Sequence, residues 1–255
     1  MVTAIIIQAR MGSSRLPGKM LRLLGGRSIL AEVIRRCRAI PSADAVCLAS
    51  PEGATDDVLA VEAERAGATV FRGDANDVLS RFAGAAEALG AHVVMRITGD
   101  KPLIDPEICG RLLRLRAEAD ADFACNNMPA GWPHGLDCEA FTSEALARAD
   151  CEAETAEDRE HVTPWLRRHA GLRRVNLQGP GGDCVDLRWT LDYPEDLAFL
   201  KALFEKLPPA PAMPLFNDVM AVLDRHPEIT AINACWQHLS RYAASSSETL
   251  PGSGG

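Results

Sequence analysis

Residues 5–19 read IIIQARMGSSRLPGK. This stretch begins with a short apolar run that predicts a buried strand. The loop that follows contains two glycines, two serines and the three cations Arg10, Arg15 and Lys19. Glycine lets the backbone approach an anion closely, while amides, hydroxyls and cations bind phosphate oxygens. The stretch therefore predicts a strand that ends in a loop suited to a triphosphate.

Two common phosphate motifs do not fit this loop. Five residues rather than four separate Gly12 from Gly18, and Met20 stands where a Walker loop has its metal-binding serine or threonine. The dinucleotide pattern G-x-G-x-x-G is absent as well. A solvated Gly/Ser/Arg turn is the alternative interpretation. We favour phosphate binding, because ligands of open parallel sheets lie beyond the carboxyl ends of the strands, where this loop stands.

Strands and helices alternate outward from this loop. Apolar runs predict strands at residues 4–7, 45–49, 69–71, 92–97 and 122–125. Apolar residues at helical spacing predict helices at residues 28–39, 56–66, 77–89 and 106–119. This alternation is typical of an α/β fold, with a mostly parallel sheet and helices on both of its faces.

The pattern changes at about residue 126. We expect a small β/α excursion over residues 126–180, with a strand near the end of AGWPHGLDCEAF and helices at 143–149 and 158–169. It would cover the active site or form a dimer interface. Strands are then predicted at 173–177 and 186–191, before a helix that begins at Pro194 and has Asp192 as a plausible cap.

The chain divides into a main domain at residues 1–207, including the excursion, and a C-terminal extension. The linker LPPAPAMP introduces this helical extension, residues 208–242, with helices expected at 215–223 and 229–242. Residues 243–255 are rich in Ser and Gly and are predicted to be disordered.

Bulk composition excludes several classes of protein. The 255 residues are 47% hydrophobic and 24% charged, as in ordinary globular domains. A net charge of -8 disfavours nucleic-acid binding, which needs a cationic face. Neither a signal peptide nor a membrane-spanning run of about 20 apolar residues is recognisable, so we expect a cytoplasmic protein without membrane contact. The eight cysteines show no C-x-x-C spacing and are expected to be reduced and mostly buried.

Several separate motifs together resemble a known family. They are, in chain order, IIIQARMGSSRLPGKML, FRGDANDVLSRF, RITGDKPLIDPE, GLDCEAF, DREHVTPW and RWTLDYPEDL. The chain resembles the spore-coat polysaccharide type of cytidylyltransferase, which belongs with the acylneuraminate and 3-deoxy-manno-octulosonate cytidylyltransferases. The resemblance extends over roughly residues 5–200, and residues after about 208 match nothing in it.

This resemblance implies a fold and a reaction. The fold would be a nucleotide-binding fold of the glycosyltransferase-A type, which makes residues 1–207 a nucleotidyltransferase domain. The enzyme would depend on Mg²⁺ (or Mn²⁺) and form a homodimer. It would convert CTP and a sugar acid to a CMP-sugar and pyrophosphate for surface polysaccharide biosynthesis.

The resemblance also assigns the nucleotide site. The triphosphate would be held by Arg10, Gly12, Ser13, Arg15 and Lys19. Ala9, Arg72 and Thr98 would lie near the base or ribose. Arg10 and Lys19 are predicted to act in catalysis together with two aspartates, Asp100 and Asp192.

The two aspartates are the predicted metal ligands. Asp100 follows the strand VVMRITGD and therefore projects from the carboxyl edge of the sheet. Mg²⁺ is usually held by one or two carboxylates plus substrate phosphates, which suits Asp100. Asp192, after RWTL, resembles the family's second metal carboxylate and would lie on the side of the nucleophile. Helix capping is the alternative for Asp192, and Asp105 before Pro106 is predicted to be a cap only.

Six residues are candidates for binding the acceptor. Asp137 and Glu139, one residue apart on a predicted strand, would face the same side and accept hydrogen bonds from sugar hydroxyls. Arg159, His161, Arg188 and Trp189 would bind an acidic group or stack on a ring. The alternatives are an ordinary charged helix start and a core tryptophan. Lys101 stands where family members usually carry Cys, so the sequence leaves the acceptor open.

Two other functions compete with this one. A glycosyltransferase of the same fold would bind a nucleotide sugar rather than make one. The loop has more cations than a diphosphate sugar needs, and the reaction products would distinguish the two. A non-catalytic nucleotide-binding module is the other alternative, which the combination of Arg10, Lys19 and Asp100 disfavours.

Overall fold

In the computed structural model, which describes residues 1–239, strand β1 (Thr3–Gln8) lies near the middle of a seven-stranded sheet. The strand order is β5-β4-β1-β6-β8-β7-β9. Four neighbouring strands run parallel: β5 (Thr69–Gly73), β4 (Ala45–Pro51), β1 and β6 (Val93–Thr98). The predicted α/β fold with a mostly parallel sheet is confirmed.

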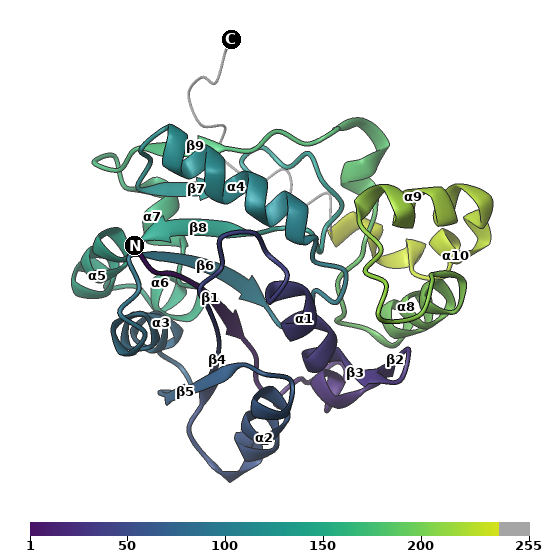
Figure 1. Cartoon of the computed structure of the whole chain (residues 1–255), viewed down its shortest axis with the longest axis horizontal. Coiled ribbons are helices and arrows are strands. Elements are labelled where there is room, and N and C mark those ends of the chain that lie inside the picture. Colours follow the sequence, from purple (N-terminus) through teal and green to yellow (C-terminus); the bar gives the residue numbers. More distant parts are fainter. Residues whose placement is uncertain (240–255) are drawn as a thin grey trace.

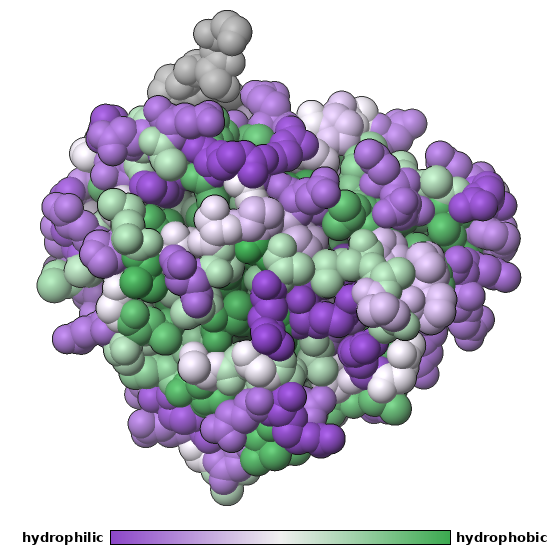
Figure 2. Space-filling view, viewed as in Figure 1, coloured by the Kyte–Doolittle hydropathy of each residue, from purple (hydrophilic) through white to green (hydrophobic). Residues whose placement is uncertain are grey.

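Both faces of this sheet are covered by helices (Figure 1). Alternate residues of β1 enter different cores, because successive side chains of a strand point to opposite faces. Ile5 and Ile7 contact the core under α1 (Ile29–Cys37), α2 (Asp57–Arg65) and α4 (Pro106–Glu118). Ala4 and Ile6 contact the core under α3 (Val78–Ala88), α5 (Ser143–Glu152) and α7 (Pro164–Arg168). The face in Figure 2 is hydrophilic over most of its rim, and hydrophobic residues show mainly towards its centre.

Part of the predicted excursion belongs to the central sheet. Strand β8 (Glu139–Thr142) is inserted antiparallel between β6 and β7 (Phe123–Cys125), and β9 (Arg174–Asn176) extends the sheet beyond β7. Ala140 and Phe141 of β8 are buried in the cores on opposite faces. Burial on both faces explains why the two central residues of β8 are apolar and why the strand lies within the sheet.

The strand predicted at residues 186–191 does not form. A 3-10 helix, η3 (Gly182–Asp186), ends there, and the backbone then bonds to loops. Trp189 N–H donates to the carbonyl of His134, and Leu191 N–H donates to that of Asp100. The segment is apolar because Trp189 and Leu191 are buried in a third core, not because it pairs within the sheet.

This third core joins the C-terminal helices to the rest of the chain. Helices α8 (Pro194–Lys206), α9 (Phe216–Arg225) and α10 (Pro227–Ala231) contribute to it together with Leu16 and Leu24. The helix expected at 229–242 is interrupted: the described residues form α10, the 3-10 helix η4 (Ala234–Trp236) and helical residues 237–239. The rest of it and the tail predicted to be disordered lie outside residues 1–239. No helix within those residues is long and apolar enough to cross a membrane.

The cysteines follow the sequence prediction in most positions. All eight are free, and five of them are buried: Cys37, Cys47, Cys109, Cys125 and Cys138. A short helix, α6 (Ala156–His161), precedes α7 in the chain.

Candidate active site

The loop after β1 lines a cavity of about 360 Å³. Its walls include the predicted residues Ala9, Arg10, Gly12, Ser13, Arg15 and Lys19. Internal hydrogen bonds fix the loop: Met11 N–H donates to Asp56 Oδ1 at 2.6 Å, and Leu16 N–H donates to Ser13 Oγ at 3.3 Å. Gly18 has a φ of 66°, which favours glycine, and Lys19 then begins a 3-10 helix. The loop therefore presents its cations to one space.

Lys19 lies between the two predicted metal carboxylates. Its Nζ is 3.2 Å from Asp100 Oδ2 and 3.1 Å from Asp192 Oδ1, and it donates to the carbonyl of Leu191 at 2.7 Å. Arg15 also reaches Asp192, with 3.4 Å between the guanidinium and Oδ1. The loop after β1 thus meets the turn that follows β6, which carries Asp100, and the segment before α8, which carries Asp192.

Asp100 is strongly held in its charged form. Burial alone would raise the pKa of this carboxyl. The positive charge of Lys19 and the hydroxyl of Thr98, which donates to Oδ1 at 2.6 Å, outweigh burial and lower the pKa to about 2. An ionised oxygen therefore faces the cavity at neutral pH.

Asp192 does not cap α8. Tyr193 occupies the N-cap position, and Asp196 accepts the backbone N–H groups of Asp192 and Tyr193 at 2.9 and 3.0 Å. Asp192 instead contacts Lys19 and accepts from Arg188 at 3.0 Å. The capping alternative for Asp192 is therefore wrong, because Tyr193 is the N-cap and Asp196 of the first turn accepts the N–H groups that lead into the helix.

Asp105 is a cap, as predicted. Its Oδ1 accepts the N–H groups of Glu107 and Ile108 at 2.8 and 3.1 Å, and its Oδ2 accepts that of Phe216. The side chain thus begins α4 and ties it to the start of α9.

A second cavity of about 260 Å³ adjoins the first. The two share four lining residues: Arg96, Thr98, Asp100 and Asp192. Asp137, Glu139 and Lys101 line only the second cavity. The two aspartates therefore stand where a space lined by phosphate-binding groups meets a space lined by polar and charged groups.

The carboxylates of the second cavity differ in how fully they are paired. Asp137 Oδ2 lies 3.6 Å from Lys101 Nζ and accepts the N–H of Gly135 at 3.1 Å. Burial would raise the pKa of Asp137, but Lys101 and His134 lower it. Asp137 therefore faces this cavity as a charged hydrogen-bond acceptor.

Glu139 is held between two guanidinium groups. Arg96 donates to its Oε2 at 2.8 Å and Arg167 donates to its Oε1 at 2.9 Å. Burial would raise the pKa of Glu139, but Arg167 and Arg96 lower it to about 2. Both carboxylate oxygens of Glu139 are therefore paired with arginines. The residue holds β6, β8 and α7 together at the cavity wall that it also lines.

Two predicted arginines lie outside both cavities. Arg72 donates to the carbonyls of Pro51 and Gly53 at 2.7 and 2.8 Å. Arg159 forms ion pairs with Asp77 and Asp150. In each case internal acceptors hold the guanidinium away from the place that the sequence predicted for it.

The remaining acceptor candidates are divided. His161 lines the loop cavity rather than the second one. Trp189 is buried in the third core, as its alternative interpretation stated. Arg188 is also buried, with its charge directed to Asp192 and Asp196, so it contacts a predicted metal ligand rather than the cavity space.

Three arginines that line the two cavities were not predicted from the sequence. Arg96 is a single cation within the apolar strand VVMRIT, and Arg81 is buried on the inner face of α3. A charge at an inward position of a buried element was the available signal. Arg167 gave no such signal, because only the packing of α7 against β8 brings it to Glu139.

The donor atoms of the site suit a divalent cation that also binds phosphate. Within residues 1–239 no group of three or more His, Cys, Asp or Glu side chains could hold a metal ion. Asp100 and Asp192 nevertheless contact the same ammonium nitrogen, so both direct an oxygen to one cationic position. Mg²⁺ needs only one or two carboxylates when phosphates complete its shell. The residues present fit Mg²⁺ or Mn²⁺ bound together with a nucleotide.

The decisive comparison is with a family model described as cytidylyltransferase, which matches residues 4–238. The chain belongs to the cytidylyltransferase family. The family predicted from the ordered motifs is confirmed, and with it a nucleotidyltransferase enzyme. The match also includes residues 208–238, for which the sequence motifs showed no resemblance.

Individual relatives agree with this assignment. The spore coat polysaccharide biosynthesis protein SpsF of Bacillus subtilis (strain 168) is 34% identical over 232 residues, or 88% of this chain and 94% of that protein. A 3-deoxy-manno-octulosonate cytidylyltransferase of Anaeromyxobacter sp. (strain Fw109-5) is 42% identical over 115 residues, 44% of this chain and 45% of that protein. The solved structure of a cytidylyltransferase from Leptospira borgpetersenii has a TM-score of 0.84 and 30% identity, covering 90% of this chain and 97% of that one.

Proposed function

We propose that this cytidylyltransferase uses CTP and Mg²⁺ (or Mn²⁺) to activate a sugar acid, giving a CMP-sugar and pyrophosphate for surface polysaccharide biosynthesis. One observation carries the proposal: Asp100 and Asp192 stand at the junction of the loop cavity and the second cavity. The loop cavity would take the triphosphate and the second cavity the acceptor. The α-phosphorus and the attacking hydroxyl would then meet at the two aspartates.

The residues of the loop cavity fit nucleotidyl transfer. A new bond forms between an acceptor oxygen and the α-phosphorus while pyrophosphate leaves, so positioning and charge neutralisation account for most of the catalysis. Arg10, Arg15 and Lys19 line the space expected for the triphosphate. Asp100 and Asp192 would hold the metal. When bound, the ion would neutralise phosphate charge and make the acceptor hydroxyl easier to deprotonate.

The second cavity supports a polyhydroxylated acid as acceptor. Asp137 offers acceptor oxygens for sugar hydroxyls, while Lys101 and Arg167 line the same space and offer N–H donors for a carboxylate. The named activity of the relative from Anaeromyxobacter, on 3-deoxy-manno-octulosonate, is of this substrate class.

The test is pyrophosphate release from each of the four nucleoside triphosphates with a panel of sugar acids. We expect release with CTP and at least one acid, dependent on Mg²⁺ or Mn²⁺. Release of a nucleoside phosphate from a nucleotide sugar, without pyrophosphate formation, would instead support the glycosyltransferase alternative.

Two further parts of the proposal follow the family resemblance. We propose a cytoplasmic enzyme that acts as a homodimer. Cell fractionation tests the location, and light scattering of the purified protein tests the mass in solution. A monomer at all working concentrations would contradict the dimer.

A further inference from the structure

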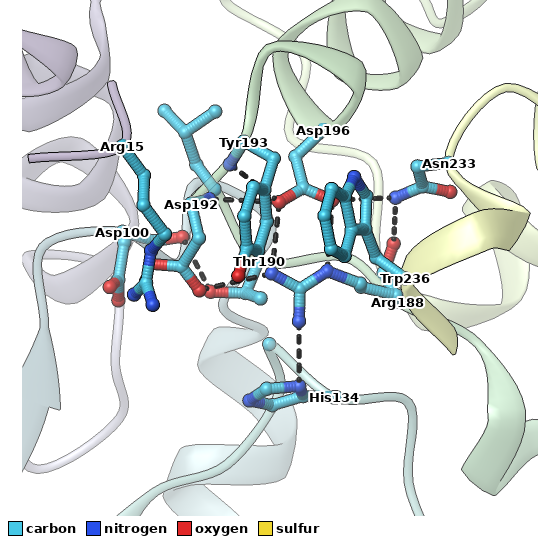
Figure 3. Close-up of polar contacts among 12 residues, drawn as sticks. Arg15, Asp100, His134, Arg188, Thr190, Asp192, Tyr193, Asp196, Asn233 and Trp236 are labelled. Atoms are coloured by element: carbon cyan, nitrogen blue, oxygen red, sulfur yellow. Dashed lines mark hydrogen bonds and ion pairs between the residues drawn. The ribbon is translucent and has the colours of Figure 1, made fainter. Parts of the chain in front are cut away.

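Asn233 connects the C-terminal segment to the active site. It lies between α10 and η4 and is only 1% exposed. Its Nδ2 donates to the carbonyl of Arg188 at 2.9 Å and to Asp196 Oδ1 at 3.0 Å (Figure 3). Both partners are acceptors only, so the amide nitrogen satisfies two groups that water does not reach.

Asp196 connects Asn233 to Arg188 and Asp192. The carboxylate is fully buried and accepts two bonds from Arg188, each 2.9 Å long. It also accepts the backbone N–H of Asp192 at 2.9 Å. Asp196 therefore fixes the backbone of Asp192 and the guanidinium of Arg188 together.

Arg188 completes the connection at the Asp192 side chain. Its guanidinium donates to Asp192 Oδ2 at 3.0 Å (Figure 3). The other oxygen, Oδ1, is 3.1 Å from Lys19 Nζ. The planar guanidinium is itself held by its two bonds to Asp196, so the single bond that it gives Asp192 has a fixed direction. One oxygen of Asp192 is thereby tied to a buried network and the other faces the junction of the cavities.

A second connection, made by aromatic rings, runs from the C-terminal segment to the loop after β1. The rings of Trp236 and Tyr193 stack with centroids 3.7 Å apart and planes within 9°. The guanidinium of Arg15 lies 5.1 Å from the centroid of the Tyr193 ring. The C-terminal segment is thus linked to Asp192 through Asp196 and Arg188, and to Arg15 through Tyr193.

We propose that Asn233 is a positioning residue which, through Asp196 and Arg188, orients the Asp192 carboxylate for the metal–nucleotide complex. Asn233, between α10 and η4, then serves the active site, whereas Ile229 of α10 serves only the third core. The inference rests on the proposed function, since it assumes that Asp192 binds the metal. Removal of groups that orient a metal ligand commonly costs 10- to 100-fold in metal affinity or activity.

Mn²⁺ binding in the presence of CTP, followed by electron paramagnetic resonance, tests the inference without turnover. Asn233→Leu should raise the half-saturating Mn²⁺ concentration about 10-fold, and Asn233→Ser, which keeps one donor, should give a smaller rise. The matched control is Ile229→Ala in α10, because Ile229 is buried in the third core but is not part of the network. We expect this control to lower the melting temperature while leaving Mn²⁺ binding unchanged.

A double-mutant cycle separates positioning from general loosening. Asp192→Asn alone should weaken Mn²⁺ binding, and Asn233→Leu should add nothing in that background if it acts through Asp192. Additive effects, an unchanged Asn233→Leu protein, or an equal loss in Ile229→Ala would each overturn the inference. A wild-type protein that binds no Mn²⁺ with CTP would overturn it as well. Mn²⁺ binding without CTP turnover would contradict the proposed function alone.

Discussion

At the scale of single residues, Lys19 has the most constrained position in the loop. Its ammonium is within hydrogen-bonding distance of Asp100, Asp192 and the carbonyl of Leu191. A cation at this point keeps two carboxylates close together when no nucleotide is bound. It also lines the cavity in which we place the phosphates, so the same side chain serves the empty and the loaded site.

Lys19→Ala is expected to lower kcat/KM for CTP by roughly 10- to 100-fold. This corresponds to about 1.5 to 3 kcal/mol, the usual value of a hydrogen bond to a charged group. Steady-state kinetics measure the effect. Arg22→Ala is the matched control, because Arg22 is an exposed cation three residues away that does not line either cavity. Equal kinetics for the wild type and Lys19→Ala would remove the loop from the triphosphate site.

The two aspartates give a second prediction at this scale. Asn at either position keeps the shape but removes a charge, and loss of a metal carboxylate should reduce turnover by more than about 100-fold. Because Asp192 does not cap α8, helix stability gives no reason for Asp192→Asn to fail. Turnover across a Mg²⁺ titration and melting temperatures measure both variants. A near-normal Asp192→Asn enzyme beside an inactive Asp100→Asn enzyme would leave Asp100 as the only proposed protein ligand.

At the scale of elements, Glu139 joins β8 to its neighbours. It pairs with Arg96 of β6 and with Arg167 of α7. The pKa of Glu139 falls from the usual 4.5 to about 2 in the folded protein. A lowered folded pKa stabilises the protein above the unfolded value, and that stabilisation is lost as the pH falls towards the folded value.

We therefore expect acid to remove on the order of 3 kcal/mol of stability through Glu139 between about pH 4.5 and pH 2. Urea unfolding at a series of pH values measures it. Glu139→Gln should show a shallower fall over this range, whereas Asp100 titrates alike in both proteins. Glu118→Gln, at the exposed end of α4, is the control and should follow the wild type. Parallel curves for Glu139→Gln and the wild type would contradict the assignment.

Elements were predictable from sequence where local pattern decides them. The apolar runs of β1, β4, β5 and β6 and the cap of α4 at Asp105 follow from neighbouring residues alone. The place of β8 does not, because antiparallel pairing with β6 depends on residues far apart in the sequence. Residues 186–191 are apolar, as a buried strand would be, but their backbone groups bond to loops. Burial alone does not reveal which of these two arrangements forms.

The same limit applies to the site. Loop residues such as Gly12 and Lys19 could be predicted because a strand end fixes their location. Arg72 and Arg159 could not, since a long side chain pairs with whichever acceptors the fold brings near. Asn233 gave no local signal, because its contacts to Arg188 and Asp196 arise only from the third core.

At the scale of the whole molecule, the three cores meet around the active site. The first two hold the sheet that carries Asp100, and the third joins Leu16 of the loop to Leu191 and to α8–α10. A ligand that bridges the loop, Asp100 and Asp192 therefore contacts elements from all three cores. Such a ligand should stabilise the chain as a unit, because it binds only where the native arrangement exists.

Thermal stability gives the corresponding prediction about the nucleotide. A ligand at 100 times its dissociation constant stabilises the native state by about 2.7 kcal/mol. For a domain of this size that is a rise in melting temperature of about 5 to 10 °C. We expect CTP with Mg²⁺ to produce this rise at a concentration where ATP, GTP and UTP produce less. Differential scanning fluorimetry measures all four, with Lys19→Ala as the variant that should lose the CTP effect. Equal rises for the four nucleotides would contradict the proposed preference for CTP, and a rise preserved in Lys19→Ala would place the nucleotide elsewhere.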